Sequence, residues 1–328
     1  MPVARGKLLS ALGLIALVSL ATAVSVGSSS TGPGDVVAIL LGDADTLSRD
    51  VVLGLRLPRA LAAFGTGACL ALAGVLMQVL LRNPLADPYI LGTSGGAAVA
   101  ALLVMLAGTT GLAVDAAAFT GALVSTLLVF GLASASGRWA PARLLLTGVV
   151  IAAGWSAVIS LLLATSPETS LRGILFWLMG DFAFTATPWP ALATAAVGTV
   201  TGIALGRSLN LLSCGERQAT LLGLRVGPVR GAAYFLSAAL TAVAVTTAGT
   251  VGFVGLVVPH LIRLLSGTDH RRLIPAAALA GGSLLVLADI LARTVVAPRQ
   301  LPVGAITAII GVPLFVVLLS RHTPHSMD

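Results

Sequence analysis

The sequence predicts an all-α protein that crosses a membrane about ten times. Only 9% of its 328 residues are Asp, Glu, Lys or Arg, 57% are hydrophobic, and the mean hydropathy is +1.03. Apolar runs recur from end to end, at the length of roughly 20 residues that a helix needs to cross a bilayer core. A water-soluble fold would have too few polar residues to cover its surface. The short segments of alternating polarity that are typical of membrane β-barrels are missing.

The individual spans follow from apolar runs that end at charged residues, Gly or Pro. Within a single transmembrane domain of residues 1–328, we expect helices over 8–26, 60–81, 91–107, 111–134, 143–164, 189–206, 229–250, 252–266, 273–293 and 303–320. The apolar stretch from Leu171 to Gly180 is too short to cross, so it predicts a re-entrant or interfacial helix. A cleaved secretory signal over Met1 to Gly27 is an alternative for the first run. An uncleaved helix fits better, because the other spans need the N-terminus inside.

The basic residues predict the orientation of these spans. With the N-terminus in the cytoplasm, 13 of the 19 Lys and Arg residues fall in inner loops, against 4 of the 12 Asp and Glu residues. Inner loops rich in Lys and Arg are the main determinant of membrane topology. We therefore expect both termini in the cytoplasm. The formal net charge of +7 then belongs to these loops and does not indicate binding of nucleic acid.

Four arginines on the outer side depart from this rule. Arg56 and Arg59 precede the second span, and Arg293 and Arg299 follow the ninth. Two interpretations stay open from these residues alone: contact with lipid headgroups, or a group of guanidinium ions that bind acidic partners. Asp289 lies four residues before Arg293, so the two share a helix face and predict a structural ion pair.

An inner loop contains a candidate amphipathic helix over residues 214–223. Gly215 and Gly223 bound it, and Gly227-Pro228 breaks the chain before the next span. A short helix of this kind is suited to docking into a groove on a cytoplasmic partner. An ordinary loop is the alternative.

The sequence does not favour catalysis or metal binding. It has no G-x-x-x-x-G-K-[ST] motif and only one lysine, Lys7, so an ATPase that drives transport would be a separate chain. It has no H-E-x-x-H motif, Cys/His cluster or close set of three carboxylates, so we expect no metal site and no cofactor. His260, which follows Pro259, is expected to be a hydrogen-bonded residue at a helix end.

A series of short motifs runs in order from about Arg56 to Leu319. They are R-L-P-R at 56–59, Gln78 followed by R-N-P-L-A-D-P at 82–88 and L-G at 91–92, G-L at 223–224, G-F-V-G-L-V-V-P-H-L-I-R at 252–263, D-H-R at 269–271, A-D at 288–289, A-R at 292–293 and L-P-V-G at 301–304. Each motif alone is modest, but the ordered set is specific. It resembles the FecCD family of ABC importer permeases, which carry ferric siderophores, haem or cobalamin.

The resemblance implies a permease subunit that works by alternating access in the inner membrane of a bacterium. It implies a second permease subunit, with a homodimer expected, two cytoplasmic ATPase subunits, and an extracytoplasmic substrate-binding protein. An ion-gradient-driven secondary transporter is the alternative function, but an intramembrane ionisable relay could include only Asp289 and Asp181. A membrane enzyme is a third possibility, and it would need a nucleophile–base pair that the sequence does not show.

The same resemblance assigns roles to individual residues. Arg56, Arg59 and Arg293 would dock acidic residues of the binding protein, and Arg56 and Arg59 are expected to be exposed. The contact with the ATPases would involve Gly215, Glu216, Arg217, Gln218, Ala219, Leu222, Gly223 and Leu224, within a segment that continues to Gly227. Trp177, Met179 and Gly180 would belong to the pathway or its outer gate, followed by Asp181 where the family often has a small residue. Structural roles are expected for Asn83, Pro84, Asp87, Pro259, His260 and Asp289.

Overall fold

The computed structural model describes residues 5–27, 32–41, 46–135, 140–183, 185 and 187–321, and all regular structure within these ranges is helical. The helices are α1 (Arg5–Ser25), α2 (Pro33–Leu41), α3 (Thr46–Arg49), η1 (Asp50–Arg56), α4 (Leu57–Leu80), η2 (Pro88–Leu91), α5 (Thr93–Leu106), α6 (Leu112–Ser134), α7 (Pro141–Ala164), α8 (Glu168–Met179), α9 (Trp189–Ser213), α10 (Glu216–Leu221), α11 (Val226–Ala248), α12 (Val254–Ser266), α13 (His270–Thr294) and α14 (Val303–Arg321).

Each of the ten expected spans overlaps one long or apolar helix. Within the described residues, seven helical segments are long and apolar enough to cross a membrane, with mean hydropathy between 1.3 and 2.2. The other three are shorter apolar helices, namely α5, α12 and the Val303–Leu318 part of α14. The short helix expected over 171–180 is α8. The predicted fold class, an all-α membrane protein, is confirmed.

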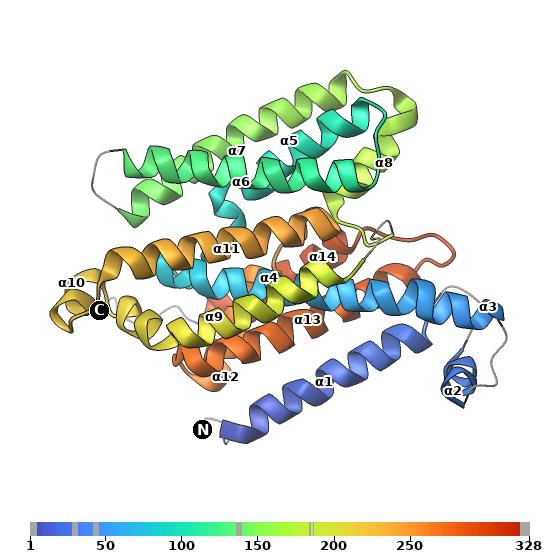
Figure 1. Ribbon diagram of the computed structural model, residues 1–328, viewed down its shortest axis with the longest axis horizontal. Coiled ribbons are helices and arrows are strands. Elements are labelled where there is room, and N and C mark those ends of the chain that lie inside the picture. The colour runs from blue at the N-terminus through green and yellow to red at the C-terminus, as the bar shows by residue number, and fades with distance from the viewer. Residues whose placement is uncertain are drawn as a thin grey trace.

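The helices form a bundle around α4 (Figure 1). In Figure 1, α5, α6 and α7 lie together as one layer, α11 and α4 run beneath it, and α13 and α1 lie on the other side. Helix α4 packs against α13, α11, α9 and α12. Nineteen of its 24 residues are buried, which makes α4 the centre of the core.

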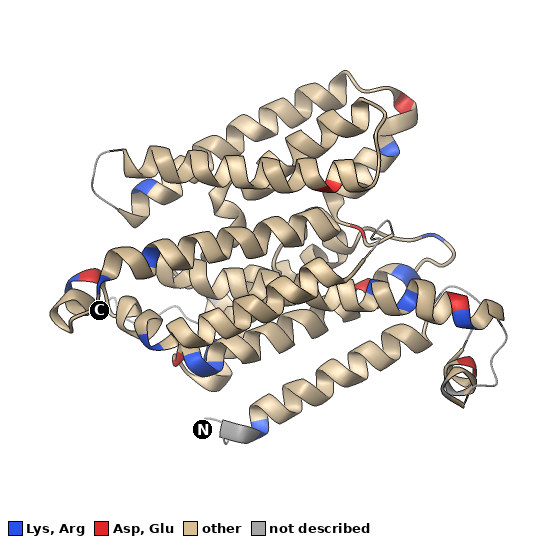
Figure 2. Cartoon of the chain, in the orientation of Figure 1, with Lys and Arg blue, Asp and Glu red and all other residues tan. Residues whose placement is uncertain are grey.

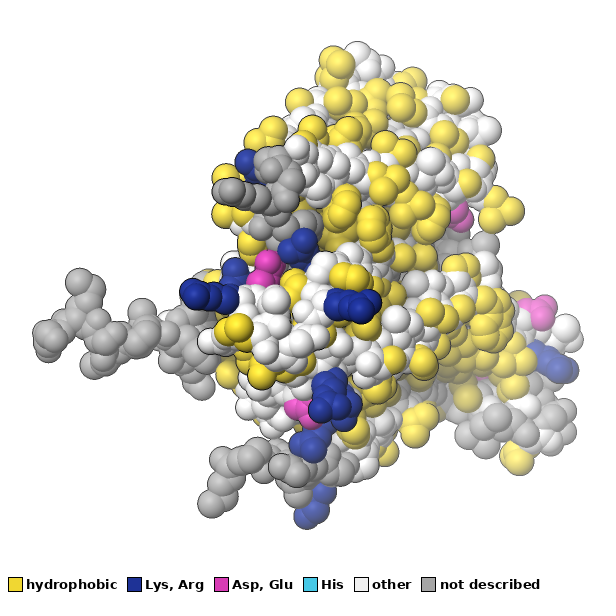
Figure 3. Space-filling model, turned by 60° about the vertical axis from the view of Figure 1, so that its left-hand side comes forward, with side chains coloured by type: hydrophobic (Ala, Val, Ile, Leu, Met, Phe, Trp, Pro, Cys, Tyr) yellow, Lys and Arg dark blue, Asp and Glu magenta, His cyan; other side chains and the backbone are white. Residues whose placement is uncertain are grey.

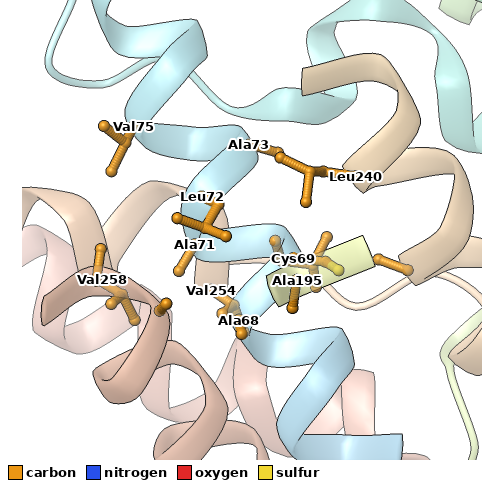
Figure 4. Packing of buried hydrophobic residues seen from close by; sticks show 14 of the residues in the cluster. Ala68, Cys69, Ala71, Leu72, Ala73, Val75, Ala195, Leu240, Val254 and Val258 are labelled. Carbon is orange, nitrogen blue, oxygen red and sulfur yellow. The ribbon is translucent and has the colours of Figure 1, made fainter. Parts of the chain in front are cut away.

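Small residues let the neighbours of α4 approach closely. A Cβ atom placed at Gly67 would collide with the Gly281 carbonyl of α13, and one at Gly74 would collide with the Gly255 carbonyl of α12. Close backbone approach supplies the packing contacts that hold helices together in lipid, where hydrophobic burial no longer drives association. Figure 4 shows the adjoining apolar packing, in which alanines and leucines of α4 meet residues of α9, α11 and α12.

Helices α3 and η1 run on into α4, so that Thr46–Leu80 is one helical segment of 35 residues. One expectation about local structure was wrong. His260 lies in the interior of α12, together with Pro259, and not at a helix end. Helix α12 begins at Val254 and continues to Ser266, so the proline is accommodated inside it.

The charged residues gather at the two ends of the helices. Figure 2 shows Lys, Arg, Asp and Glu near both ends of the bundle, whereas the middle of the long helices is almost free of them. Helix α10 lies at one end, and α2, α3 and α8 lie at the other. The two ends therefore hold the candidate functional residues.

Candidate functional site

At the end opposite α10, two arginines share one buried carboxylate. Asp289, in α13, has a side chain that is only 1% exposed. The Arg59 guanidinium donates to Asp289 Oδ1 from Nη2 at 2.8 Å and from Nε at 3.0 Å. Arg293 Nε lies 3.0 Å from Asp289 Oδ2, which is the i,i+4 pair that the sequence spacing predicts. One negative charge thus bridges α4 and the C-terminal end of α13.

A second carboxylate, Asp181, lies against the same arginine. Arg59 Nη2 is 3.6 Å from Asp181 Oδ1, and Arg59 Nη1 donates to Gln300 Oε1 at 3.0 Å. Burial raises the pKa of Asp181, an effect partly offset by the hydrogen bond from the Ala183 N–H and by the charge of Arg59. Arg59 is therefore bound by α13, by the loop after α8 and by the loop after α13.

The other two arginines hold the C-terminal end of α1. Arg56 Nη1 donates to the carbonyl oxygens of Val24 at 3.0 Å and Ser25 at 3.2 Å. Arg293 Nη2 donates to the carbonyl oxygen of Ala23 at 3.3 Å. The last carbonyls of a helix have no partner within it and carry partial negative charge, so cations are stabilising there. Arg56 and Arg293 supply these cations.

These contacts correct the expectation that Arg56 and Arg59 are exposed, and they enclose Arg293 as well. Arg56 and Arg293 are each 5% exposed, and the Arg59 side chain is 12% exposed. The sequence shows their position near the membrane edge but not their partners. Asp289 and the end of α1 come from distant parts of the chain, and they enclose the guanidinium groups. The sequence marks Asp181 as a departure from the family pattern and as a candidate for an ionisable relay, but not as a partner of Arg59.

The loop after α8 connects the cluster to two further helices through backbone hydrogen bonds. The Asp181 N–H donates to the Ala248 carbonyl at the end of α11, and the Val303 N–H at the start of α14 donates to the Gly180 carbonyl, both at 2.9 Å. Thr250 Oγ1 donates to the Leu178 carbonyl. We call this junction of residues 177–181, 248–251 and 303–304 the outer junction, after the side of the membrane that the loop charges predict for it.

Glycine is required at the centre of the outer junction. Gly180 has φ +82°, and a Cβ atom there would lie 2.7 Å from the Thr250 carbonyl oxygen. Trp177 is half-buried, whereas Met179 is 44% exposed. The predicted gate residues thus lie where α8, α11, α12 and α14 meet.

At the opposite end, α10 presents most of its side chains outward. Ala219 is fully buried against the bundle, whereas Arg217, Gln218, Leu222 and Gly223 are exposed. Leu221 and Leu222 are 80% and 65% exposed. The predicted amphipathic helix is therefore present, as one six-residue helix between Gly215 and Gly223, both with positive φ. Figure 3 shows this end coming forward, with basic side chains gathered on it and hydrophobic ones over the flanks.

One ion pair attaches α10 to the bundle, and one backbone hydrogen bond closes the C-terminal end of α10. Glu216 Oε1 lies 3.1 Å from Arg230 Nη1 of α11, and the Leu224 N–H donates to the Ala219 carbonyl at 2.9 Å. The ion pair therefore joins the projecting α10 to α11.

The loop between α4 and α5 has its own local hydrogen bonds. Asn83 Oδ1 accepts from the Leu85 N–H at 2.9 Å, and Asp87 Oδ1 accepts from the Tyr89 N–H at 2.8 Å at the start of η2. Burial raises the pKa of Asp87 to about 6, against the lowering effect of the Tyr89 N–H. Pro84 lies exposed between the two. The geometry is that of a capped turn.

In the part of the chain that the structure describes, no three His, Cys, Asp or Glu side chains are grouped to hold a metal ion. The features that stand out are a buried arginine–carboxylate cluster at one end of an apolar helical bundle and a projecting helix at the other. They define a multi-pass membrane protein with a candidate contact surface at each end. Its family follows from comparison with known proteins.

The model of the FecCD transport family matches residues 14–321. The hemin transport system permease protein HmuU of Yersinia pestis is 41% identical over 279 residues, which is 82% of this chain and 83% of that protein. The vitamin B12 import system permease protein BtuC of Yersinia enterocolitica is 41% identical over 271 residues, 81% of each. A solved structure of an inward-facing metal-chelate type ABC transporter superimposes with a TM-score of 0.83 at 32% identity, over 97% of this chain and 100% of that one. The chain belongs to the FecCD transport family.

Proposed function

We propose that this chain is the membrane-spanning permease subunit of an ABC importer that moves a metal chelate across the inner membrane of a bacterium. The observation that carries the proposal is the family match over residues 14–321. Relatives of more than 40% identity are named as permeases for hemin and for vitamin B12. Both of these cargoes are metal ions held in large organic ligands, so the substrate class is a bulky chelate.

The proposal includes partners that supply energy and specificity. The chain has no phosphate-binding motif, so ATP hydrolysis falls to two separate cytoplasmic subunits. Exposed Leu221 and Leu222 beside Arg217 and Gln218 make α10 suited to a groove on each ATPase. The charge asymmetry of the loops supports a cytoplasmic location for α10 and both termini. Two copies of the chain would enclose the pathway.

On the outer side, a soluble binding protein would deliver the chelate. Arg56, Arg59 and Arg293 carry three positive charges against the two negative charges of Asp181 and Asp289. The charge of Asp35 also acts on Arg56, so each arginine already has an acidic neighbour in the chain, which an acidic group of the docking protein could replace. Because the arginines are enclosed, docking would require some of their present contacts to be exchanged.

Transport would proceed by alternating access. The coupling requires that ATP and the docked protein bind the two conformations with different affinity. The outer junction, with Trp177, Met179 and Gly180, would open and close the outer side, and α10 would transmit the movement of the ATPases. A secondary transporter is less well supported, because Asp181 and Asp289 both lie at one end of the bundle and both contact Arg59.

Assembly provides the experimental test of this proposal. The chain, carrying an affinity tag, is expressed with the ATPase subunit and the binding protein of the same importer, and is purified in mild detergent. We expect a complex with equal numbers of permease and ATPase chains that binds the binding protein. A chain that purifies stably without either partner, under conditions in which both are present and folded, would contradict the proposal.

A further inference from the structure

Asp181 contributes to the outer cluster in two different ways. Its side chain, 8% exposed, lies against Arg59 Nη2 at 3.6 Å. Its main-chain N–H donates to the Ala248 carbonyl. The carbonyl of the preceding residue, Gly180, accepts a hydrogen bond from the Val303 N–H. One residue therefore contacts the arginine cluster with its carboxylate and the outer junction with its backbone.

The local structure holds this carboxylate in place. Asp181 Oδ1 accepts a hydrogen bond from the Ala183 N–H at 2.9 Å, a short side-chain to backbone turn that is typical of Asp and Asn. The hydrogen bond keeps Oδ1 on the side of Arg59. An asparagine could keep the same hydrogen bond through its amide oxygen and would lack only the charge.

Arg59 has a stronger partner than Asp181. Its bonds to Asp289 are 2.8 to 3.2 Å long, whereas the distance to Asp181 is 3.6 Å. A carboxylate approaching from outside would therefore displace Asp181 from Arg59 before it displaced Asp289. After this exchange Arg59 would still be paired with Asp289, so the charges of that buried pair would stay balanced.

We propose that Asp181 is a positioning residue that competes with a docking partner's carboxylate for Arg59 and connects that arginine to the outer junction. When an acidic group of the docked protein takes the place of Asp181, the loop after α8 loses its attachment to α4 and the outer junction is free to rearrange. The inference rests on the proposed function, because it assumes that an acidic binding protein docks at this end.

The test compares Asp181→Asn with the wild type in the complete complex of permease, ATPase and binding protein. Loss of the competing charge is expected to tighten docking of the binding protein by about tenfold. It is also expected to raise ATP hydrolysis in the absence of cargo, because the outer junction is no longer held by Arg59. Docking that is unchanged or weaker in the variant would overturn the proposal, since a merely structural role predicts no gain in affinity.

The matched control is Glu168→Gln, which removes one negative charge from the first turn of α8, where Glu168 is exposed. It measures the long-range effect of charge on the same side of the protein, and we expect a change in docking of less than about twofold. If the two variants tighten docking equally, Asp181 does not act through contact. Asp181→Ser repeats the test with a smaller polar group if the asparagine variant does not assemble.

A double-mutant cycle shows whether Asp181 acts through Arg59. In an Arg59→Gln background, the gain in docking from Asp181→Asn should disappear. A gain of equal size in both backgrounds would contradict the inference. Docking by the wild-type complex is measured in the same series: its absence would count against the proposed function, whereas its presence without an Asp181 effect counts only against this inference.

Discussion

Asn210 of α9 and His270 of α13 are joined by two contacts. The His270 N–H donates to Asn210 Oδ1 at 2.9 Å, and His270 Nδ1 lies 2.6 Å from the same oxygen. Asn210 Nδ2 also donates to Asp269 Oδ1 at 2.9 Å. A single amide side chain therefore links the end of α9, close to α10, with the beginning of α13, whose other end carries Asp289 and Arg293.

Replacing this amide should loosen the joint between α9 and α13. We expect Asn210→Leu to lower the free energy of unfolding by about 1–3 kcal/mol, because the buried polar groups of His270 lose their partner. The amide also lowers the pKa of Asp269. A carboxyl with a lowered pKa stabilises the folded state above its ordinary pKa of 3.8, and this stabilisation is lost as the pH falls through the lower folded value.

Thermal unfolding of the detergent-solubilised protein between pH 3 and pH 8 measures both effects. The stability difference between wild type and Asn210→Leu should be largest at neutral pH and should shrink at the acid end. Ser213→Ala, which removes an exposed hydroxyl bonded to the Asn210 carbonyl, is the control and should change stability by less than about 0.5 kcal/mol. A difference that does not depend on pH would contradict the role assigned to Asp269.

Neutralising Asp289 should be severely destabilising. The Asp289→Asn variant leaves Arg59 and Arg293 enclosed without their shared negative charge. Breaking a buried ion pair from one side costs about 3–5 kcal/mol. The control is Asp115→Asn in the first turn of α6, away from the cluster. Chemical unfolding monitored by tryptophan fluorescence would show the difference, and equal stability of the two variants would refute the structural role of Asp289.

Polar residues at Leu221 and Leu222 should weaken assembly without affecting the fold. Both side chains are exposed in the isolated chain, so the double change to Ser should shift the unfolding temperature little. We expect at least about tenfold weaker binding of the ATPase subunits, because the apolar anchor of α10 is removed. Leu112→Ser, at a position that is also 80% exposed but on α6 at the other end, should leave ATPase binding unchanged. Normal assembly of the double variant would rule out this contact surface.

The buried carboxyl of Asp87 predicts a pH dependence of stability. Its pKa is raised from 3.8 to about 6, so between these values the folded protein binds more protons than the unfolded chain. The contribution of Asp87 to the free energy of unfolding therefore falls as the pH rises from about 4 to about 6, and it stays low above pH 6. Asp87→Asn keeps the acceptor for the Tyr89 N–H and removes the titration.

The expected result is a gain in stability for Asp87→Asn, relative to wild type, that grows as the pH rises through this window. At pH 7.5 it should be on the order of 1 kcal/mol. Unfolding temperatures at pH 4.5 and pH 7.5 give the comparison. Parallel changes in both proteins would show that Asp87 does not titrate in this range.

The sequence predicts the helices well and the contacts of the charged residues poorly. Apolar runs locate each span because a bilayer demands a fixed length of hydrocarbon. The glycines that bound α10, Gly215 and Gly223, are visible as chain breakers. The enclosure of Arg56 and Arg59 is different, because their partners lie in α1 and α13. Only the i,i+4 spacing of Asp289 and Arg293 gives a local signal for that cluster.

Transport by the reconstituted complex tests the central claim most directly. The permease is placed in liposomes with its ATPase subunits, and uptake of a radiolabelled metal chelate is followed with the loaded binding protein outside the vesicles. We predict uptake that requires ATP on the α10 side and that persists after ion gradients are collapsed. Uptake by the permease alone, driven by an ion gradient without ATP, would contradict the account.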